Sequence, residues 1–286
     1  MSNFETNDHF YLSTNALSLM NSYVGSTFVV KYGGSAMRNN VLQSNVVQDL
    51  CFLRLLGINI VLVHGGGFFI NEWLSRLNIE PKFENGIRVT DFETMELAEM
   101  VLTGKINKEL VSLFNQNNIF CVGLSGKDAN LVQASAMFDS PENLTGKVDL
   151  VNKKILNLLL SNNCLPVIAS IASDLQGNTY NVNADTVASA IASTLKADKL
   201  ILLTDTPGIL YDSSNYSTTI KDLNLKTIES LQLQHIISGG MIPKIQSSID
   251  ALKLGVESVH IIDGTLRHAL LYEVFTSERI GSKIVL

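Results

Sequence analysis

Residues 58–67 read Ile-Asn-Ile-Val-Leu-Val-His-Gly-Gly-Gly, a short apolar run that stops at three consecutive glycines. An apolar run of this length, rich in β-branched residues, predicts a buried strand over 58–63. Glycine lets the chain turn tightly and lets a ligand approach the backbone closely. Apolar residues at helical spacing follow at 69–77. A buried strand, a glycine turn and a helix form the unit from which parallel α/β sheets are built.

The same unit occurs earlier, where residues 27–34 read Thr-Phe-Val-Val-Lys-Tyr-Gly-Gly before a helical pattern at 45–56. The pattern then continues along the chain. Strands are predicted at 119–124, 165–171, 199–203 and 258–262, and helices at 92–115, 153–160, 186–195 and 243–254. We therefore expect an α/β fold with a mostly parallel central sheet sandwiched by helices, with β-hairpin excursions at 81–89 and 130–151.

A Gly-Asn turn at 177–178 marks a mild break in this pattern. We expect residues 25–177 and 178–286 to form two lobes that share one sheet, preceded by a separate N-terminal segment over 1–24. Ligands of open α/β sheets bind beyond the carboxyl ends of the strands, and both glycine groups follow predicted strands. Two such loops at neighbouring strand ends predict an anion site, although each alone could be a plain turn.

Composition narrows the function. The 286 residues are 46% hydrophobic and 17% charged, which predicts a well-packed globular protein. A net charge of −6 gives no basic surface for nucleic acid or for an acidic membrane. The three cysteines are far apart, without a CxxC motif, so neither a zinc site nor a disulfide framework is expected. A secretory signal and an apolar run long enough to span a membrane are both absent, so we expect a soluble intracellular protein.

Two lysines occur at positions where an ordinary exposed lysine is not expected. Lys31 ends an apolar strand just before Gly33 and Gly34. Lys244 follows Gly-Gly-Met-Ile-Pro at 239–243 and is predicted to lie in the first turn of a helix that begins at Pro243. The helix dipole disfavours a cation there, which indicates that an anion binds nearby. The alternative is that both are ordinary surface lysines.

Two further charges have a functional and a structural interpretation. Asp185 follows Asn-Val-Asn-Ala at 181–184 and could hold two lysines together, or it could simply cap the helix that starts there. Arg88, in Asn-Gly-Ile-Arg-Val-Thr at 85–90, suits bidentate capture of a carboxylate. The alternative for Arg88 is an ion pair with Asp91 or Glu84. His64 is interpreted as a packed core residue, because no acidic partner is evident.

The familiar nucleotide-binding signatures are absent. The chain has no GxxxxGK[ST] loop, no GxGxxG after a strand with an acidic residue at the expected distance, and no protein-kinase motif set. The turn Thr-Asp-Thr-Pro-Gly at 204–208 follows a predicted strand and could line an adenine or ribose pocket. If the chain binds a nucleotide, another fold must hold it.

Six segments, 31–34, 63–67, 85–90, 181–185, 203–209 and 239–244, taken in this order and spacing, resemble the amino-acid kinase superfamily and, within it, the N-acetylglutamate kinase family. The resemblance runs from about Phe28 to the C-terminus. It implies the amino-acid kinase fold, ATP with Mg²⁺ carried by the nucleotide, and phosphorylation of the γ-carboxylate of N-acetyl-L-glutamate in arginine biosynthesis. It also implies no metal site on the protein, and no general base, because a carboxylate is already a nucleophile.

The resemblance implies a role for each matching residue. Lys31 and Lys244 would bind the phosphates of ATP, and Asp185 would hold both lysines. The acceptor would be bound by Gly66, Gly67, Arg88 and Asn181. The nucleotide would be contacted by Gly33, Gly34, Thr204, Asp205, Gly208, Gly240 and Met241. The lobe 25–177 would then bind the acceptor, and the lobe 178–286 the nucleotide.

The chain also resembles the arginine-sensitive, ring-forming branch of the family, in which an extra N-terminal helix joins dimers into a trimer of dimers. A helix at 11–23 would do this here, and His260 with Glu273 would bind L-arginine as feedback inhibitor. Arg279 stands where the family usually has a glycine. Similar enzymes of photosynthetic lineages bind the PII signalling protein, so PII is a possible partner, and the compartment is the cytoplasm or the plastid stroma. The alternatives are aspartate, glutamate, carbamate or UMP as acceptor, or an inactive arginine-sensing ring.

Overall fold

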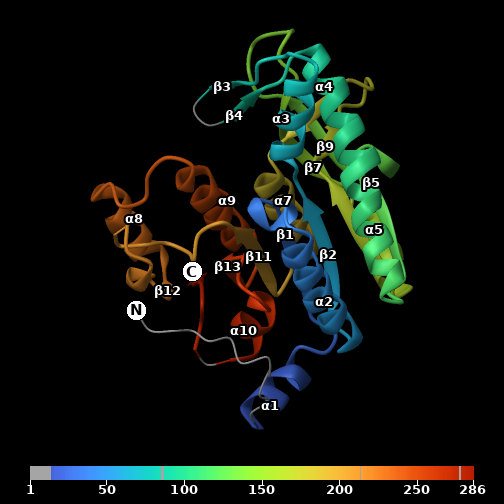
Figure 1. The fold of residues 1–286 in the computed structure, drawn as a ribbon. Coiled ribbons are helices and arrows are strands. Elements are labelled where there is room, and N and C mark those ends of the chain that lie inside the picture. Colours follow the sequence, from blue (N-terminus) through green and yellow to red (C-terminus); the bar gives the residue numbers. More distant parts are fainter. Residues whose placement is uncertain (1–13, 85–86, 213, 277) are drawn as a thin grey trace.

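The computed structural model describes residues 14–84, 87–212, 214–276 and 278–286 (Figure 1). A central sheet of eight strands has the order β12-β14-β13-β11-β1-β2-β8-β5. Every neighbouring pair is parallel except β13 and β14. The predicted fold class is confirmed. The strands are β1 (Thr27–Tyr32), β2 (Asn59–His64), β5 (Cys121–Ser125), β8 (Leu165–Ala169), β11 (Lys199–Thr204), β12 (Asp222–Leu223), β13 (Ser258–Asp263) and β14 (Ser282–Ile284).

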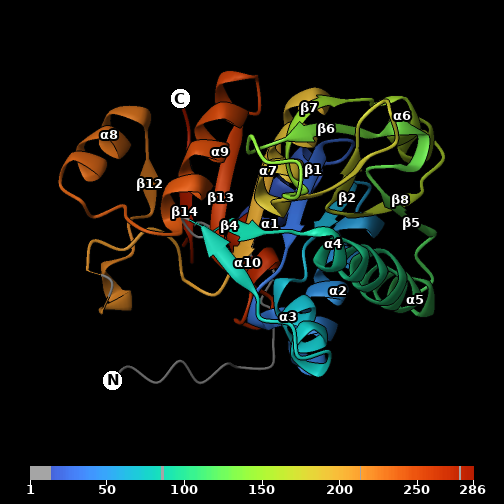
Figure 2. The ribbon, with the colours of Figure 1, turned by 90° about the horizontal axis from the view of Figure 1, so that it is seen from above.

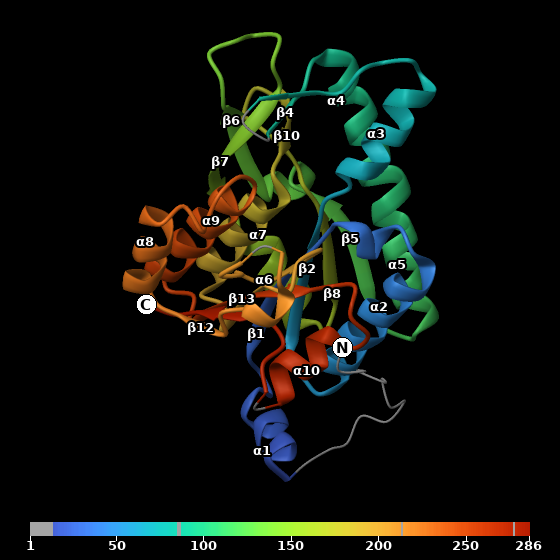
Figure 3. The same ribbon diagram turned by 60° about the vertical axis from the view of Figure 1, so that its left-hand side comes forward.

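Helices cover both faces of this sheet (Figure 3). One face carries α2 (Asn40–Leu55), α5 (Asn107–Gln116) and α10 (Ala269–Phe275). The other carries α6 (Lys154–Ser161), α7 (Ala184–Leu195), α8 (Leu225–Leu233) and α9 (Met241–Lys253). Seen from above, α8, α9 and β12 lie at one edge of the sheet, and α5 and β5 lie at the other (Figure 2).

Strand β1 shows how the sheet directs a charged side chain. Side chains alternate between the two faces of a strand. Phe28 and Val30 enter the core beneath α2, and Val29 enters the core beneath α7. Lys31 has the same parity as Val29, so its side chain extends toward α7. The sequence period therefore places this lysine on the side where Asp185 begins its helix.

A second, smaller sheet was not predicted. Strands β10 (Thr179–Val182), β7 (Thr145–Val151), β6 (Val132–Ala136) and β9 (Ile171–Ser173) close into a barrel. The predicted strand at 165–171 splits into β8 and β9 because the chain leaves the main sheet at Ser170. The hairpins predicted at 81–89 and 130–151 are present as β3 (Lys82–Glu84) with β4 (Ile87–Val89), and as β6 with β7.

The predicted boundary at 177/178 lies between β9 and β10, which pair with each other. The central sheet takes β1, β2, β5 and β8 from one side of this boundary and β11 to β14 from the other. Residues on both sides of the predicted boundary therefore contribute strands to the main sheet and to the barrel. Their division into an acceptor lobe and a nucleotide lobe stays a prediction.

Several helix boundaries differ from the predicted ones. Helix α9 begins at Met241, two residues before Pro243, although Lys244 still lies in its first turn. The helix predicted at 92–115 consists of α4 (Phe92–Glu99), a π-helix η2 (Met100–Ile106) and α5. The described residues also form α3 (Gly67–Arg76) and three short 3-10 helices, η1 (Ser35–Met37), η3 (Asp128–Asn130) and η4 (Tyr216–Thr218).

The N-terminal helix is present as α1 (Thr14–Ser22), which packs against α10 (Figure 1). Ala16 and Met20 are buried, while Leu17 is exposed. Residues 11–13 of the predicted helix lie outside the described residues. Within the described ranges, no helix is both long enough and apolar enough to cross a membrane.

Candidate active site

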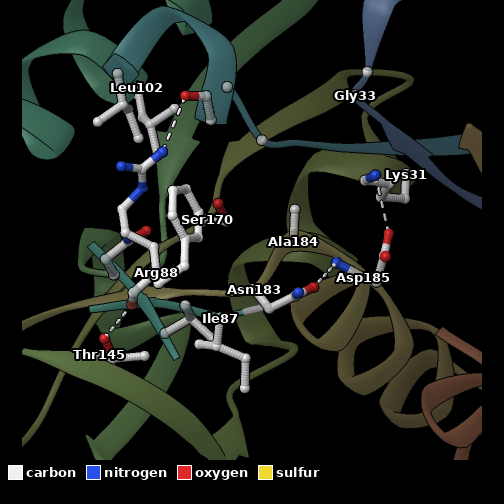
Figure 4. Close-up of a pocket in the computed structure, with 18 residues that line it drawn as sticks. Lys31, Gly33, Ile87, Arg88, Leu102, Thr145, Ser170, Asn183, Ala184 and Asp185 are labelled. Atoms are coloured by element: carbon white, nitrogen blue, oxygen red, sulfur yellow. Dashed lines mark hydrogen bonds and ion pairs between the residues drawn. The ribbon is translucent and has the colours of Figure 1, made fainter. Parts of the chain in front are cut away.

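A cavity of about 260 Å³ lies beyond the carboxyl ends of β1, β2 and β8, the position expected for ligands of an open α/β sheet. Figure 4 shows Arg88 on one side of it and Lys31 with Asp185 on the other. Eight of the predicted site residues line it, namely Lys31, Gly33, Gly34, Gly66, Gly67, Arg88, Asn181 and Asp185. The fold thus brings together residues from separate parts of the chain.

Asp185 joins the two predicted lysines. Its Oδ1 lies 3.0 Å from Lys31 Nζ, and its Oδ2 lies 2.7 Å from Lys244 Nζ. Lys244 does not line the cavity, but it reaches the cluster from the first turn of α9. The helix-capping interpretation of Asp185 is wrong. Asn183 caps α7, accepting hydrogen bonds from the backbone N–H groups of Asp185 and Thr186, which leaves the Asp185 carboxylate free for the lysines.

The three charges of this cluster do not balance. Burial alone would raise the pKa of Asp185, but the ammonium groups of Lys31 and Lys244 lower it to about 2. Asp185 is therefore ionised at neutral pH. Burial lowers the pKa of Lys244, and the attraction of Asp185 opposes that shift. With both ammonium groups charged, two cations outnumber the single carboxylate of this cluster, and the nearby carboxylate of Asp205 also attracts Lys244.

The two glycine loops are held by packing and by one hydrogen-bonded carboxylate. Gly34 has a φ of +76°, and a Cβ there would collide with the Asp205 carboxylate. Asp205 Oδ1 accepts hydrogen bonds from the Ser35 N–H at 2.7 Å and from the Ser35 hydroxyl at 2.9 Å. A Cβ on Gly66 would collide with the side chains of Leu102 and Ile106. The π-helix therefore packs directly against the second glycine loop.

The two terminal nitrogens of the Arg88 guanidinium differ in their hydrogen bonds. Its Nη2 donates to Gly67 O at 3.1 Å and to Asn71 Oδ1 at 2.5 Å, and its guanidinium lies 4.9 Å from the centre of the Phe83 ring. Its Nη1 is buried without a hydrogen-bond partner. Among the described residues, no ion pair joins Arg88 to Asp91 or Glu84, and Asp91 instead caps α4 by accepting a hydrogen bond from the Thr94 N–H.

The barrel supports the acceptor side of the cavity. Thr145 Oγ1, on β7, donates to Arg88 O at 2.7 Å (Figure 4). Asn181 Nδ2, on β10, donates to Thr90 Oγ1 at 3.1 Å. The ribbon β3–β4 is thereby fastened to the barrel, so Arg88 is placed by contacts on both sides. Asn85 and Gly86 of the sequence motif lie outside the described residues.

The other residues predicted to contact nucleotide do not line this cavity. Thr204, Asp205, Gly208, Gly240 and Met241 lie at the end of β11, in the turn after it, and at the start of α9. Gly208 has a φ of +134°, and a Cβ there would collide with Ser282, so close packing already explains this glycine. Their contact with a nucleotide stays a prediction.

Sequence reasoning missed several residues of the cavity, namely Ile70, Phe83, Ile87, Leu102, Thr145, Ser170 and Asn183. Asn183 carried a usable signal, because asparagine before a helical pattern predicts an N-cap. Thr145 and Ser170 carried none. They lie on segments that the barrel brings to the site, and the barrel itself was not predicted.

His260 and Glu273 lie apart from the cavity. His260 Nδ1 is 2.7 Å from Glu273 Oε1, and both side chains are buried. Glu273 Oε2 accepts hydrogen bonds from the N–H groups of Ile280 at 3.1 Å and of Gly281 at 3.0 Å. The unusual Arg279 forms an ion pair with Asp222 on β12. The structure thus places the two predicted arginine-site residues in direct contact with each other.

Comparisons with known proteins point to one family. A profile described as the amino acid kinase family matches residues 26–263. The chain is 56% identical to the acetylglutamate kinase of Gracilaria tenuistipitata over 100% of both chains. It is 48% identical to that of Thermosynechococcus vestitus, over 97% of this chain and 94% of the relative.

Solved structures show the same fold. N-acetylglutamate synthase from Neisseria gonorrhoeae, complexed with coenzyme A and N-acetyl-glutamate, matches with a TM-score of 0.84 at 23% identity. The match covers 95% of this chain and 62% of the synthase. Carbamate kinase from Giardia lamblia bound to AMP-PNP matches with a TM-score of 0.65 at 18% identity, over 91% of this chain and 98% of that one. By its profile match and its full-length relatives, the chain belongs to the amino acid kinase family.

Proposed function

We propose that the chain phosphorylates the γ-carboxylate of N-acetyl-L-glutamate with ATP, giving N-acetyl-L-glutamyl 5-phosphate for arginine biosynthesis. The observation that carries the proposal is one cavity with two unlike ends. Lys31 and Asp185, which also holds Lys244, lie at one end, and Arg88, whose buried Nη1 has no hydrogen-bond partner, lies at the other. The full-length relatives named acetylglutamate kinase support the same acceptor.

The residues present fit the phosphates of ATP. Lys31 and Lys244 share one carboxylate, so a polyphosphate would complete the charge balance of the cluster. We infer from the family that Mg²⁺ would be carried by the nucleotide, since Mg²⁺ usually binds through phosphate oxygens and few protein ligands. Mg²⁺ would neutralise phosphate charge and shape the nucleotide.

The acceptor end fits a carboxylate. A buried donor without a partner is unfavourable, and an anionic oxygen would satisfy Arg88 Nη1 with a charge-assisted bond. We infer that Arg88 binds a carboxylate of acetylglutamate together with Asn181. The N–H groups of Gly66 and Gly67 would face the reacting carboxylate. Because Arg88 Nη2 already carries two hydrogen bonds, a bidentate contact would have to share that nitrogen.

The chemistry follows from these positions. A γ-carboxylate oxygen attacks the γ-phosphorus in line, forming an O–P bond while the bond to the departing ADP oxygen breaks. Lys31 and Lys244 offset the charge on the transferring group, and Asp185 keeps their ammonium groups from separating. No proton is moved, so no base is needed. Catalysis rests on positioning and electrostatic stabilisation.

An assay of ADP release with a panel of acceptors tests the proposal. We expect turnover with N-acetyl-L-glutamate and Mg²⁺, and much slower turnover with glutamate, aspartate, carbamate or UMP. Hydroxylamine should trap the acyl phosphate product. Equal rates with unacetylated glutamate would remove the acetyl-specific assignment. No turnover with any acceptor would favour the inactive arginine-sensing ring, against which the complete Lys31–Asp185–Lys244 cluster now counts.

We also propose that L-arginine inhibits the enzyme at the region of His260 and Glu273, and that the chain assembles as a trimer of dimers. Helix α1 supports this, because it packs on α10, the helix that carries Glu273. A second contact joins the end of this segment to β11. The ammonium of Lys199 lies 4.8 Å from the ring centre of Tyr23, the residue that follows α1. We propose PII as a protein partner, and the cytoplasm or the plastid stroma as the compartment.

A further inference from the structure

His64 is the last residue of β2 and stands directly before the glycine loop. Its side chain is completely buried. Its Nδ1 lies 3.0 Å from the carbonyl oxygen of Gly65, and its Nε2 lies 3.1 Å from Asn107 Nδ2. Asn107 is itself buried and is the first residue of α5, immediately after the π-helix. The two side chains therefore connect α5 to the backbone of the acceptor loop.

The surroundings of Asn107 fix the direction of this connection. Its Nδ2 also lies within hydrogen-bonding distance of two carbonyl oxygens, 3.0 Å from Val167 O and 3.3 Å from Leu124 O. Its Oδ1 accepts from Lys108 Nζ at 3.1 Å. The amide nitrogen must face the carbonyl oxygens and the amide oxygen must face the ammonium, which fixes the orientation of the amide. The two N–H hydrogens are shared among Val167 O, Leu124 O and His64 Nε2, and an amide nitrogen cannot accept. Asn107 Nδ2 is the donor toward His64.

The orientation of Asn107 decides the tautomer of His64. Because Asn107 donates to Nε2, that nitrogen must accept, and the ring proton must lie on Nδ1, where it donates to Gly65 O. Burial lowers the pKa of His64 to about 4, and the nearby Lys108 ammonium also disfavours a second proton. The ring is neutral at physiological pH and carries its proton on the side of the loop.

The hydrogen bond from His64 Nδ1 ends on Gly65 O, in the loop that we propose binds the acceptor. The carbonyl of Gly65 and the N–H of Gly66 lie in one planar peptide unit, so fixing one fixes the direction of the other. Gly123, on β5, leaves space for the side chain of Asn107, because a Cβ on Gly123 would collide with Asn107 Oδ1. Replacing that glycine would displace the amide.

We propose that Lys108, Asn107 and His64 form a one-way hydrogen-bond relay that orients the Gly65–Gly66 peptide, so that the Gly66 N–H faces the acceptor carboxylate. This role rests on the proposed function, in which Gly66 binds the acceptor. His64 and Asn107 are positioning residues. Neither donates a proton to the reaction.

Nuclear magnetic resonance of the full chain with ¹⁵N-labelled histidine tests the relay without any assay of activity. We expect His64 to be neutral with its proton on Nδ1 throughout pH 5.5–8. A proton on Nε2, or titration of His64 within that range, would overturn the relay. This result is independent of which acceptor the enzyme uses.

A matched pair of variants tests the positioning role. In His64→Asn the side-chain amide can replace the Nδ1 donor to Gly65 O, whereas His64→Gln keeps a polar group near Nε2 and loses that donor. Both remove the same buried ring, so the loss of packing is shared. We expect KM for the acceptor found by the panel assay, N-acetylglutamate if the proposed function holds, to rise about five- to ten-fold in His64→Gln and to stay within about two-fold in His64→Asn.

The KM for ATP should change in neither variant, which separates positioning from general damage. Equal acceptor KM values in the two variants would show that the bond to Gly65 O has no role in acceptor binding. If the enzyme instead prefers an acceptor other than acetylglutamate but the pair still differs, the relay stands and only the proposed substrate fails.

Discussion

Two carboxylates, the partly buried Asp185 and the buried Glu273, hold cationic or ionisable partners in different ways. Asp185 contacts two lysines, one on each oxygen. Glu273 contacts His260 with one oxygen and accepts two backbone N–H groups with the other. The first arrangement has more cations than anions, and the second has every carboxylate oxygen satisfied. A surplus of cations suits a charged ligand, whereas saturation suits a structural joint that a ligand must compete with.

The largest effect should come from breaking the saturated pair. Glu273→Ala leaves His260 and two N–H groups without their buried acceptor, and we expect it to lower the free energy of unfolding by about 3–5 kcal/mol. Urea denaturation measures this. Glu278→Ala, at a nearby exposed carboxylate, is the control. A loss below about 1 kcal/mol would show that the joint is not structural, and the contrast with Asp185 would disappear.

Removing a lysine from the Asp185 cluster should lower kcat. Lys31→Ala or Lys244→Ala removes a cation opposed to developing phosphoryl charge, and should cost about 3–4 kcal/mol of transition-state stabilisation, roughly a hundred- to thousand-fold in kcat. Circular dichroism should show an intact fold. Lys253→Ala, exposed at the other end of α9, is the matched control. A near-normal kcat in either cluster variant would remove that lysine from the site.

A smaller effect is expected at the other end of the cavity. Arg88→Lys replaces a forked donor with a point charge and should raise KM for acetylglutamate by about ten- to a hundred-fold, the value of a charge-assisted hydrogen bond of roughly 1.5–3 kcal/mol. The KM for ATP should hardly move. Arg76→Lys, in the exposed ion pair with Glu72, controls for the substitution itself. An unchanged acceptor KM would make Arg88 purely structural.

The proposed arginine site predicts a further difference between the region of Glu273 and the region of Asp185. Deleting residues 2–22 removes α1 from its contact with α10, and should leave an active dimer whose arginine affinity is weakened about 5- to 150-fold, the usual range of coupling between sites. Sedimentation and inhibition curves on both chains measure this. A full-length protein that is already dimeric, or that ignores millimolar arginine, would contradict the regulatory part alone.

The smallest expected effect is a pH dependence of stability. The folded pKa of Asp185, about 2, lies below its ordinary value of 3.8. Its contribution to stability is therefore complete above pH 4–5 and is lost as the pH falls toward 2. The wild type should lose about 1 kcal/mol more than Asp185→Asn between pH 5 and pH 3. Parallel curves for the two proteins would show that the lysines do not stabilise the ionised carboxylate.

The sequence predicted what is local and periodic. Strands β1 and β2 and their glycine turns could be identified because the apolar period and the turn residues occur within a few positions of each other. Lys31 and Lys244 can be identified from the sequence because each follows or precedes a glycine turn, where an ordinary surface lysine is not expected. The grouping of roles, however, came from the family resemblance and not from the pattern alone.

What could not be predicted depends on distant contacts. The barrel consists of short strands whose partners are far apart in the chain, such as β7 with β10. The close packing at Gly66 comes from Leu102 and Ile106 on the π-helix, and helical periodicity does not reveal a π-turn. Asn107 looked like an ordinary polar residue in a long helix, because its partners lie on β2, β5 and β8.

The place of β1 in the sheet has a consequence for how the chain is made. Strand β1 is synthesised among the first but pairs on one side with β11, which begins at Lys199. During synthesis at roughly 5–20 residues per second, one edge of β1 stays open for about ten seconds or more until that partner emerges. An unpaired apolar edge is prone to association with other chains. The newborn chain should therefore need its chaperones most in the interval before β11 emerges.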